Sequence, residues 1–294
     1  MAQSMVYDAP AFSRRVKSQI ALRVRGHFSP SEKRIAILTR KRRSLFYDQR
    51  LENHDNEVDM ATRPALVFDV NETLLDLQHL SPFFRSAFGR DAAMREWFAQ
   101  TILYSQSLAL TGQFTPFGEL GVAVLDMQAT LANLTLSDEQ RQQFTTLMRT
   151  LPPHADALAA LQRLQQHGFR LFTLTNNSTD AQTAQLEKAG ILACFERLFS
   201  IEDAVPPACK PAVQTYRQVE QALTLQGAEL CLVACHTWDI IGARAAGWHA
   251  AMILRQGNAT LAAGPQPHYV CEDLHSLSDK LIAAYPLNDF SGRL

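Results

Sequence analysis

The sequence predicts an α/β protein in which a doubly wound parallel sheet carries a helical cap. From residue 151 onward, short apolar runs typical of buried strands alternate with segments of helical periodicity. Each of these runs ends abruptly in polar residues, as parallel strands do where they meet a binding site. A long stretch of helical pattern, residues 78–150, separates the first apolar run from the rest and predicts the cap.

The first strand is predicted over residues 65–68, where four apolar residues precede Asp69. A run without alternation is typical of a strand buried on both faces of a parallel sheet. Ligands of such sheets lie beyond the carboxyl ends of the strands, which is where Asp69 stands. A carboxylate at this point can be a nucleophile, a metal ligand or a helix cap, and the strand alone leaves all three open.

The later elements follow from apolar spacing and turn residues. In the inserted stretch, Ser137 with Gln140 three residues further on predicts the start of a helix. Ordinary core helices remain the alternative to a cap for this stretch. The predicted strands after it lie at residues 170–174, 198–201, 230–234 and 250–254, with helices between them.

Composition excludes several classes of protein. The net charge is −1, which argues against a general nucleic-acid binder, and no apolar run is long enough to span a membrane. The chain has five cysteines, an odd number, and none of them form a Cys-x-x-Cys pair, so we expect reduced thiols. With no secretory signal pattern at its start, the sequence predicts a cytoplasmic protein.

Four segments are predicted along the chain. Residues 1–62 form a basic extension that we expect to be mobile, although its basic clusters could contact nucleic acid or a membrane surface. The predicted α/β core comprises residues 63–77 and 151–285, the cap residues 78–150, and the tail residues 286–294. No nucleic-acid or membrane partner is expected.

Polar groups stand at four junctions of the predicted sheet: Asp69, Thr175 with Asn176, Lys210, and Asp239. Taken singly, each has an ordinary explanation, as a helix cap or a surface lysine. Because the carboxyl ends of parallel strands share one edge, the four junctions can converge. Four such coincidences favour a functional site.

The ordered set Asp69-x-x-x-Thr73, Thr175-Asn176, Lys210-Pro211 and Asp239 resembles the haloacid dehalogenase superfamily, over about residues 64–284. The stretch from Val233 to Asp239, followed by Gly242-Ala243-Arg244, is similar to the last motif of the L-2-haloacid dehalogenase branch. The resemblance implies a Rossmann-like core with a helical cap. It also implies a small carboxylic acid as substrate, and a homodimer stays open by analogy.

For the chemistry, the resemblance implies that Asp69 displaces halide from a short 2-haloalkanoic acid and that water then hydrolyses the aspartyl ester. Thr73 would bond Asp69, and Lys210 would keep it ionised. Asp239, with His236 nearby, would position or activate water, although His236 can also be a structural histidine. The residues expected to contact or support the substrate are Val70, Asn71, Thr175, Asn176, Tyr216 and His236.

Two departures from the family pattern keep other functions open. Asn71 stands where the superfamily's phosphatases have a second aspartate, and Cys235 where they have another acid, which disfavours Mg²⁺. No metal or cofactor is therefore expected, except Mg²⁺ if the protein is a phosphatase. Ala99 aligns with the arginine that receives halide in dehalogenases, and Arg95 is a candidate substitute. The alternatives are a phosphatase of small esters and a non-catalytic binding protein.

Overall fold

The computed structural model describes residues 63–286 of the chain. The predicted extension, residues 1–62, and most of the predicted tail, residues 287–294, lie outside the described residues. Within the described part, six parallel strands form one sheet in the order β3-β2-β1-β4-β5-β6. The strands are β1 Ala65–Phe68, β2 Leu171–Thr175, β3 Arg197–Ser200, β4 Leu230–Ala234, β5 His249–Ile253 and β6 Tyr269–Cys271.

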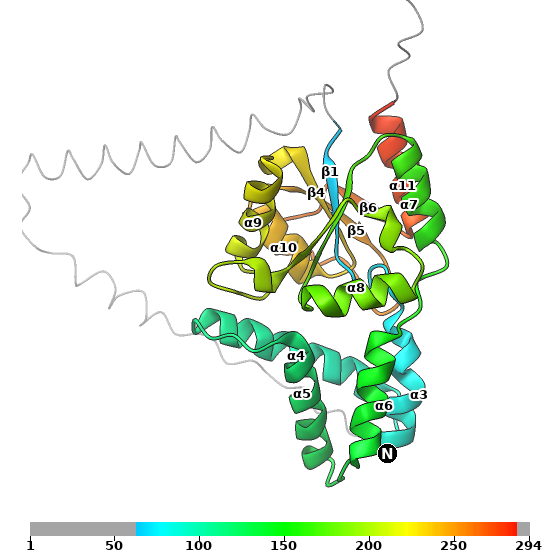
Figure 1. Ribbon diagram of the computed structural model, residues 1–294, viewed down its shortest axis with the longest axis vertical. Coiled ribbons are helices and arrows are strands. Elements are labelled where there is room, and N and C mark those ends of the chain that lie inside the picture. Colours follow the sequence, from blue (N-terminus) through cyan, green and yellow to red (C-terminus); the bar gives the residue numbers. More distant parts are fainter. Residues whose placement is uncertain (1–62, 287–294) are drawn as a thin grey trace, which may run out of the picture. The chain divides into compact units, whose positions relative to one another are not determined.

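Helices cover both faces of this sheet. They are α7 Ala157–Gln166, α8 Thr179–Lys188, α9 Val213–Leu223, α10 Thr237–Ala245 and α11 Leu274–Ala284. Figure 1 shows α9 and α10 on one side of the sheet and α7 and α11 on the other. Alternate residues of β1 explain why the strand is apolar throughout: Leu66 and Phe68 join one hydrophobic cluster, and Val67 joins the other.

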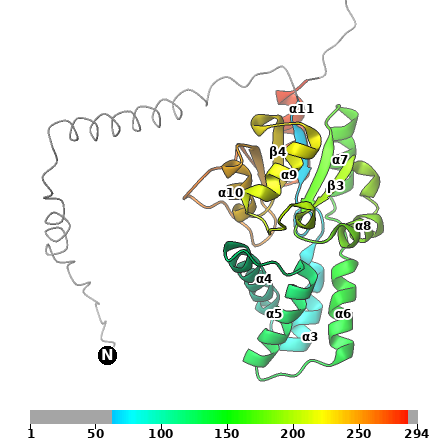
Figure 2. The same ribbon diagram turned by 60° about the vertical axis from the view of Figure 1, so that its left-hand side comes forward.

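Four helices are inserted between β1 and α7: α3 Ser81–Phe88, α4 Ala92–Leu110, α5 Phe117–Leu131 and α6 Asp138–Arg149. Both views show them as a group beyond one end of the sheet (Figures 1 and 2). Their own aromatic core is centred on Trp97, whose ring lies 5.6 Å from Phe84 and 5.1 Å from Phe144. Ser137 and Gln140 form the predicted capping box at the start of α6.

The fold class is therefore confirmed: a doubly wound parallel sheet with a helical insert. The sequence did not predict β6 or α11, and the helix α9, which the sequence pattern starts at Lys210-Pro211, begins at Val213. Among residues 63–286, no helix is long and apolar enough to cross a membrane.

Arg255 joins three distant parts of the core. Its guanidinium bonds both carboxylate oxygens of Asp156 at 2.9 Å and donates to the carbonyl of Thr73 at 3.0 and 3.2 Å. Asp156 also accepts the backbone N–H of Leu274, at the start of α11, at 2.8 Å. Although burial raises the pKa of Asp156, the bonds from Arg255 and Leu274 outweigh it, and the pKa is lowered.

We expect Arg255→Met to lower the free energy of unfolding by about 3 kcal/mol, because a nearly buried carboxylate loses its charged partner. At pH values above the ordinary pKa of aspartate, the depressed pKa of Asp156 stabilises the folded wild type. This stabilisation is lost as the pH falls through the pKa of Asp156 in the folded state. The variant should show less of this acid dependence. Denaturant unfolding between pH 3 and 7 measures both effects. Arg90→Met, which removes an exposed ion pair with Glu96, is the control and should change little.

Candidate active site

Asp69 is placed at the carboxyl end of the central strand β1. Its backbone N–H continues the ladder to β4 by donating to the carbonyl of Val233 at 3.0 Å. The Thr73 hydroxyl donates to Asp69 Oδ2 at 2.7 Å and itself accepts the N–H of Cys235 at 3.0 Å. These bonds tie the turn after β1 to the end of β4, so the carboxylate has a fixed orientation.

Lys210 lies, fully buried, between two carboxylates. Its Nζ donates to Asp69 Oδ1 at 2.7 Å, to Asp239 Oδ2 at 2.6 Å and to the carbonyl of Leu174 at 2.9 Å. An ammonium group has three N–H bonds, and all three are used. The Asn176 side chain holds the segment in place by accepting the N–H of Lys210 at 3.0 Å.

The two carboxylates differ in pKa. Burial raises the pKa of Asp69, but the charge of Lys210 and the contact with His236 outweigh it and hold the pKa well below its usual range. The pKa of Asp239 is raised by burial, to which the charge of Asp69 adds, even though Lys210 opposes the shift. Asp69 is thus the carboxylate kept ionised, as a nucleophile requires.

Tyr216 lies behind this cluster. Its hydroxyl donates to Asp239 Oδ1 at 2.6 Å, and its side chain is completely buried. It does not line the small cavity in front of Asp69, so its expected role in supporting the substrate stays a prediction. Tyr216 holds Asp239, which in turn holds Lys210.

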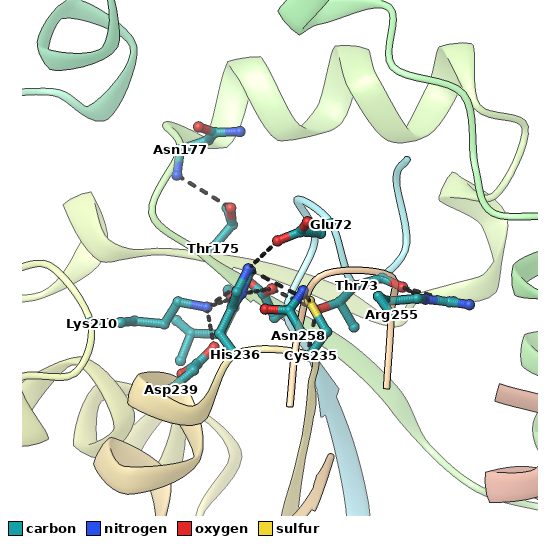
Figure 3. Close-up of polar contacts among 12 residues, drawn as sticks. Glu72, Thr73, Thr175, Asn177, Lys210, Cys235, His236, Asp239, Arg255 and Asn258 are labelled. Carbon is teal, nitrogen blue, oxygen red and sulfur yellow. Dashed lines mark hydrogen bonds and ion pairs between the residues drawn. The ribbon is translucent and has the colours of Figure 1, made fainter. Parts of the chain in front are cut away.

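His236 connects Asp69 to a residue that the sequence analysis overlooked, Glu72. Its Nε2 lies 2.8 Å from Glu72 Oε2, and its Nδ1 lies 3.2 Å from Asp69 Oδ2. The imidazole is stacked on Trp238, with ring centres 4.9 Å apart, and packs against Phe98. Figure 3 shows Glu72 and His236 pointing toward each other. The signal in the sequence that could have pointed to Glu72 is an acidic residue three positions after the predicted nucleophile.

Glu72 has a left-handed backbone, with a φ of 67°. Such a conformation is uncommon for residues other than glycine. Its carboxylate is also paired with Arg95 of α4, whose guanidinium donates to the carbonyl of Gln256. Burial raises the pKa of Glu72, but His236 and Arg95 outweigh it and the pKa is lowered. Glu72 is therefore a buried, ionised group whose position depends on the cap helix α4.

The cavity in front of Asp69 is small, with a volume of about 10 Å³, which is room for about one water molecule. Its lining contains the expected Asn71, Thr175, Asn176 and His236, together with Phe98, Ile102, Phe117 and Trp238. The side chain of Val70 is buried in the hydrophobic core, so only its backbone could serve a substrate. Ala99 is exposed, and neither Ala99 nor Arg95 lines this cavity. The role of Arg95 as a substitute for the halide arginine stays a prediction.

A larger cavity of about 710 Å³ lies beside the first and shares Phe117 with it. Its walls come from α5, α6 and the start of α8, and include Trp97, Val122, Met148 and Ser178. None of Asp69, Glu72, Lys210 and Asp239 lines it. The reactive groups therefore belong to the small cavity.

Three ligand atoms of Asp69, Cys235 and His236 lie within 4.8 Å of one another. They fit Mg²⁺ poorly, because this ion prefers oxygen ligands and only one of the three residues is a carboxylate. Burial raises the pKa of the Cys235 thiol, so the thiol stays protonated. Lys210 already neutralises Asp69. We therefore derive no reaction step through a metal.

These features define the class of protein. The chain belongs to the haloacid dehalogenase-like hydrolases, whose family model matches residues 64–247. The matched range begins before β1 and ends after α10, and so contains every junction residue described above.

Among known proteins, the chain is similar to haloacetate dehalogenase H-2 of Moraxella sp. (strain B), with 27% identity over 70% of this chain and 92% of the relative. It is also similar to (S)-2-haloacid dehalogenase H-109 of Pseudomonas putida, with 26% identity over 74% and 97% of the two chains. The fold resembles the L-2-haloacid dehalogenase of Xanthobacter autotrophicus with chloropropionic acid covalently bound. That comparison has a TM-score of 0.68 and 22% identity, and it covers 74% of this chain and 98% of the other.

Proposed function

We propose that this protein is a hydrolase of the 2-haloacid dehalogenase type. The observation that carries the proposal is Asp69, a carboxylate kept ionised by Lys210 and Thr73 beside a small cavity at the end of β1. The relatives that are haloacid dehalogenases support the same reaction class, and about a quarter of the aligned residues are identical between them and this chain.

In the first step, an oxygen of Asp69 attacks the α-carbon of a 2-haloalkanoic acid. The C–O bond forms as the carbon–halogen bond breaks, and its electron pair leaves with the halide. In the second step, water attacks the carbonyl carbon of the aspartyl ester and releases a 2-hydroxy acid. Lys210 supports both steps, because its Nζ donates to Asp69 Oδ1 and can stabilise charge on that oxygen.

The substrate would be held by neutral polar groups around Asp69. Asn71, Thr175 and Asn176 line the cavity, and His236 is the one cationic group among its lining residues. Since the cavity holds about one water molecule, we expect Phe98, Ile102 and Phe117 of the cap, which line it, to move when substrate enters.

A phosphatase is less well supported. Asn71 cannot protonate a leaving group, and Cys235 and His236 are poor partners for Mg²⁺. A binding protein without catalysis remains the alternative from another class. It would bind small carboxylates, and be stabilised by them, without turnover.

The test is halide release from a panel of L-2-haloacids without added metal, alongside hydrolysis of a generic phosphate ester with and without Mg²⁺. We expect halide release that does not respond to Mg²⁺, and no phosphate release. Mg²⁺-dependent phosphate release would instead establish the phosphatase. Silence in both assays, together with thermal stabilisation by 2-chloropropionate, would establish a binding protein.

A further inference from the structure

We propose that His236, oriented by Glu72, is the general base that activates the water which hydrolyses the Asp69 ester. This inference rests on the proposed function, because it concerns the second step of that reaction. It makes His236 a catalytic residue, since it touches the nucleophile, and Glu72 a positioning residue, since it acts through His236.

The two ring nitrogens of His236 face different groups: Nε2 contacts Glu72, and Nδ1 faces the nucleophile Asp69. Nε2 lies 2.8 Å from Glu72 Oε2, an arrangement that places a proton on Nε2. Nδ1 is buried 3.2 Å from Asp69 Oδ2 but makes no aligned hydrogen bond with any of the described residues. The stacked Trp238 and the packed Phe98 keep the ring from turning. In Figure 3, His236 reaches into the centre of the polar cluster.

Glu72 is itself held rigidly. Arg95 pairs with its other carboxylate oxygen, and its left-handed backbone sets the direction of the side chain. Strained backbone positions of this kind persist only when surrounding contacts enforce them, and they cluster at functional sites. At Glu72, the backbone N–H donates to the carbonyl of Leu75 at 2.8 Å and the carbonyl lies 2.9 Å from His154 Nε2. Its side chain pairs with His236 and Arg95.

Asp239 is not placed to take a proton from water. Tyr216 donates to its Oδ1 at 2.6 Å and Lys210 donates to its Oδ2 at 2.6 Å. The side chain of Asp239 is fully buried and does not line the small cavity in front of Asp69, which has room for a water molecule. His236 does line that cavity. Asp239 therefore supports Lys210, and the imidazole is the basic group that a water molecule can reach.

The groups that face His236 carry charges of both signs. Asp69 and Glu72 face the imidazole from the turn after β1. Cys235 precedes it in the chain and contacts it, and Asp239 follows three residues later. Two cations lie one residue further away: Lys210, which also pairs with Asp69, and Arg95 of α4, which pairs with Glu72. Burial lowers the pKa of His236, but the surrounding Cys235, Asp69 and Glu72 outweigh it and raise the pKa well above its usual value. In the resting enzyme, the imidazole is therefore a cation paired with ionised Asp69.

Formation of the ester removes the charge of Asp69 and so removes part of what keeps His236 protonated. The imidazolium then loses a proton to solvent. This positive charge balances the negative charge that left with the halide. Neutral His236 accepts a proton from water at Nδ1 while the water oxygen bonds to the ester carbonyl carbon. The carbonyl carbon then expels the 2-hydroxy acid as an alkoxide, which takes the proton of the new carboxyl group. Asp69 returns as an anion beside a protonated His236.

The test separates ester formation from ester hydrolysis, using L-2-chloropropionate, rapid quenching and intact-mass measurement. We expect His236→Gln to release one halide per enzyme in a burst and to accumulate the Asp69 ester, with hydrolysis slowed about 100-fold or more. Glu72→Gln should accumulate the same ester to a smaller extent. Glu96→Gln, on the exposed side of α4, is the matched carboxylate control and should turn over like the wild type.

The pH profile separates a positioning role of Glu72 from a merely structural one. Hydrolysis by a neutral base rises with pH as His236 loses its proton. Removing the negative charge of Glu72 lowers the pKa of His236, so the rising limb should move to lower pH in Glu72→Gln while the plateau falls. A structural role would lower the rate without moving this limb. Thermal unfolding of each variant, measured in parallel, shows whether the fold is retained.

Distinct results overturn the inference and the proposed function. If both His236→Gln and Glu72→Gln hydrolyse the ester at the wild-type rate, His236 is not the base. Accumulation of ester in Asp239→Asn alone would assign the base to Asp239. If the wild type itself forms no ester and releases no halide with any 2-haloacid, the proposed function fails and this inference falls with it.

Discussion

Asp69→Asn should abolish halide release and leave the protein without any covalent adduct after incubation with L-2-chloropropionate. The carboxamide is a poor nucleophile, and the neutral group no longer gains from the charge of Lys210, which lies 2.7 Å from Asp69 Oδ1. We expect turnover to fall by at least about four orders of magnitude, as it does when other enzymes lose their nucleophile. Halide electrodes and intact-mass measurement report the two effects.

The fold should survive this substitution. Lys210 keeps its bonds to Asp239 and to the Leu174 carbonyl, and the amide oxygen of the new side chain can still accept a hydrogen bond. Asp279→Asn on the surface of α11 is the matched control, since it makes the same chemical change far from the cavity. Halide release at the wild-type rate from Asp69→Asn would place the nucleophile elsewhere.

Lys210→Met should remove activity and also destabilise the protein. Asp69 and Asp239 would be left as two buried carboxylates without the cation between them. Removing one partner from a buried ion pair costs about 3–5 kcal/mol. Without Lys210, the pKa of Asp69 rises, and a protonated Asp69 cannot displace halide.

The contribution of Asp69 to the pH dependence of stability should change sign in this variant. In the wild type, the lowered pKa of Asp69 contributes stability above the ordinary aspartate pKa, and this contribution is lost as the pH falls through the folded value. In Lys210→Met, the carboxyl pKa values lie above those of the unfolded chain. The variant should therefore gain stability relative to the wild type as the pH falls from 7 toward 5.

Denaturant unfolding at several pH values measures this change. Lys188→Met, which removes an exposed lysine of α8, is the control and should leave stability nearly unchanged. If Lys210→Met unfolds like the wild type at neutral pH, then the cation does not stabilise the buried carboxylates, and the basis for an ionised Asp69 is lost.

The layout of the core can be predicted from the amino-acid sequence. The unbroken apolar run of β1 and the return of strand and helix patterns after residue 151 predict a parallel sheet, because each strand must be buried on both faces. The edge at which Asp69, Thr175, Lys210 and Asp239 meet follows from that topology, since parallel strands end on the same side. The residue pattern after each strand then pointed to the family.

The pairing of these side chains depends on contacts between distant parts of the folded chain. Glu72 and His236 are 164 positions apart in the chain, and no periodic pattern connects them. The direction of a turn side chain depends on its backbone, and the left-handed φ of Glu72 is not readable from the residue type. Arg95 shows a similar dependence on packing. The sequence offered it as a substitute for the halide arginine, and the approach of α4 to the turn after β1 pairs it with Glu72.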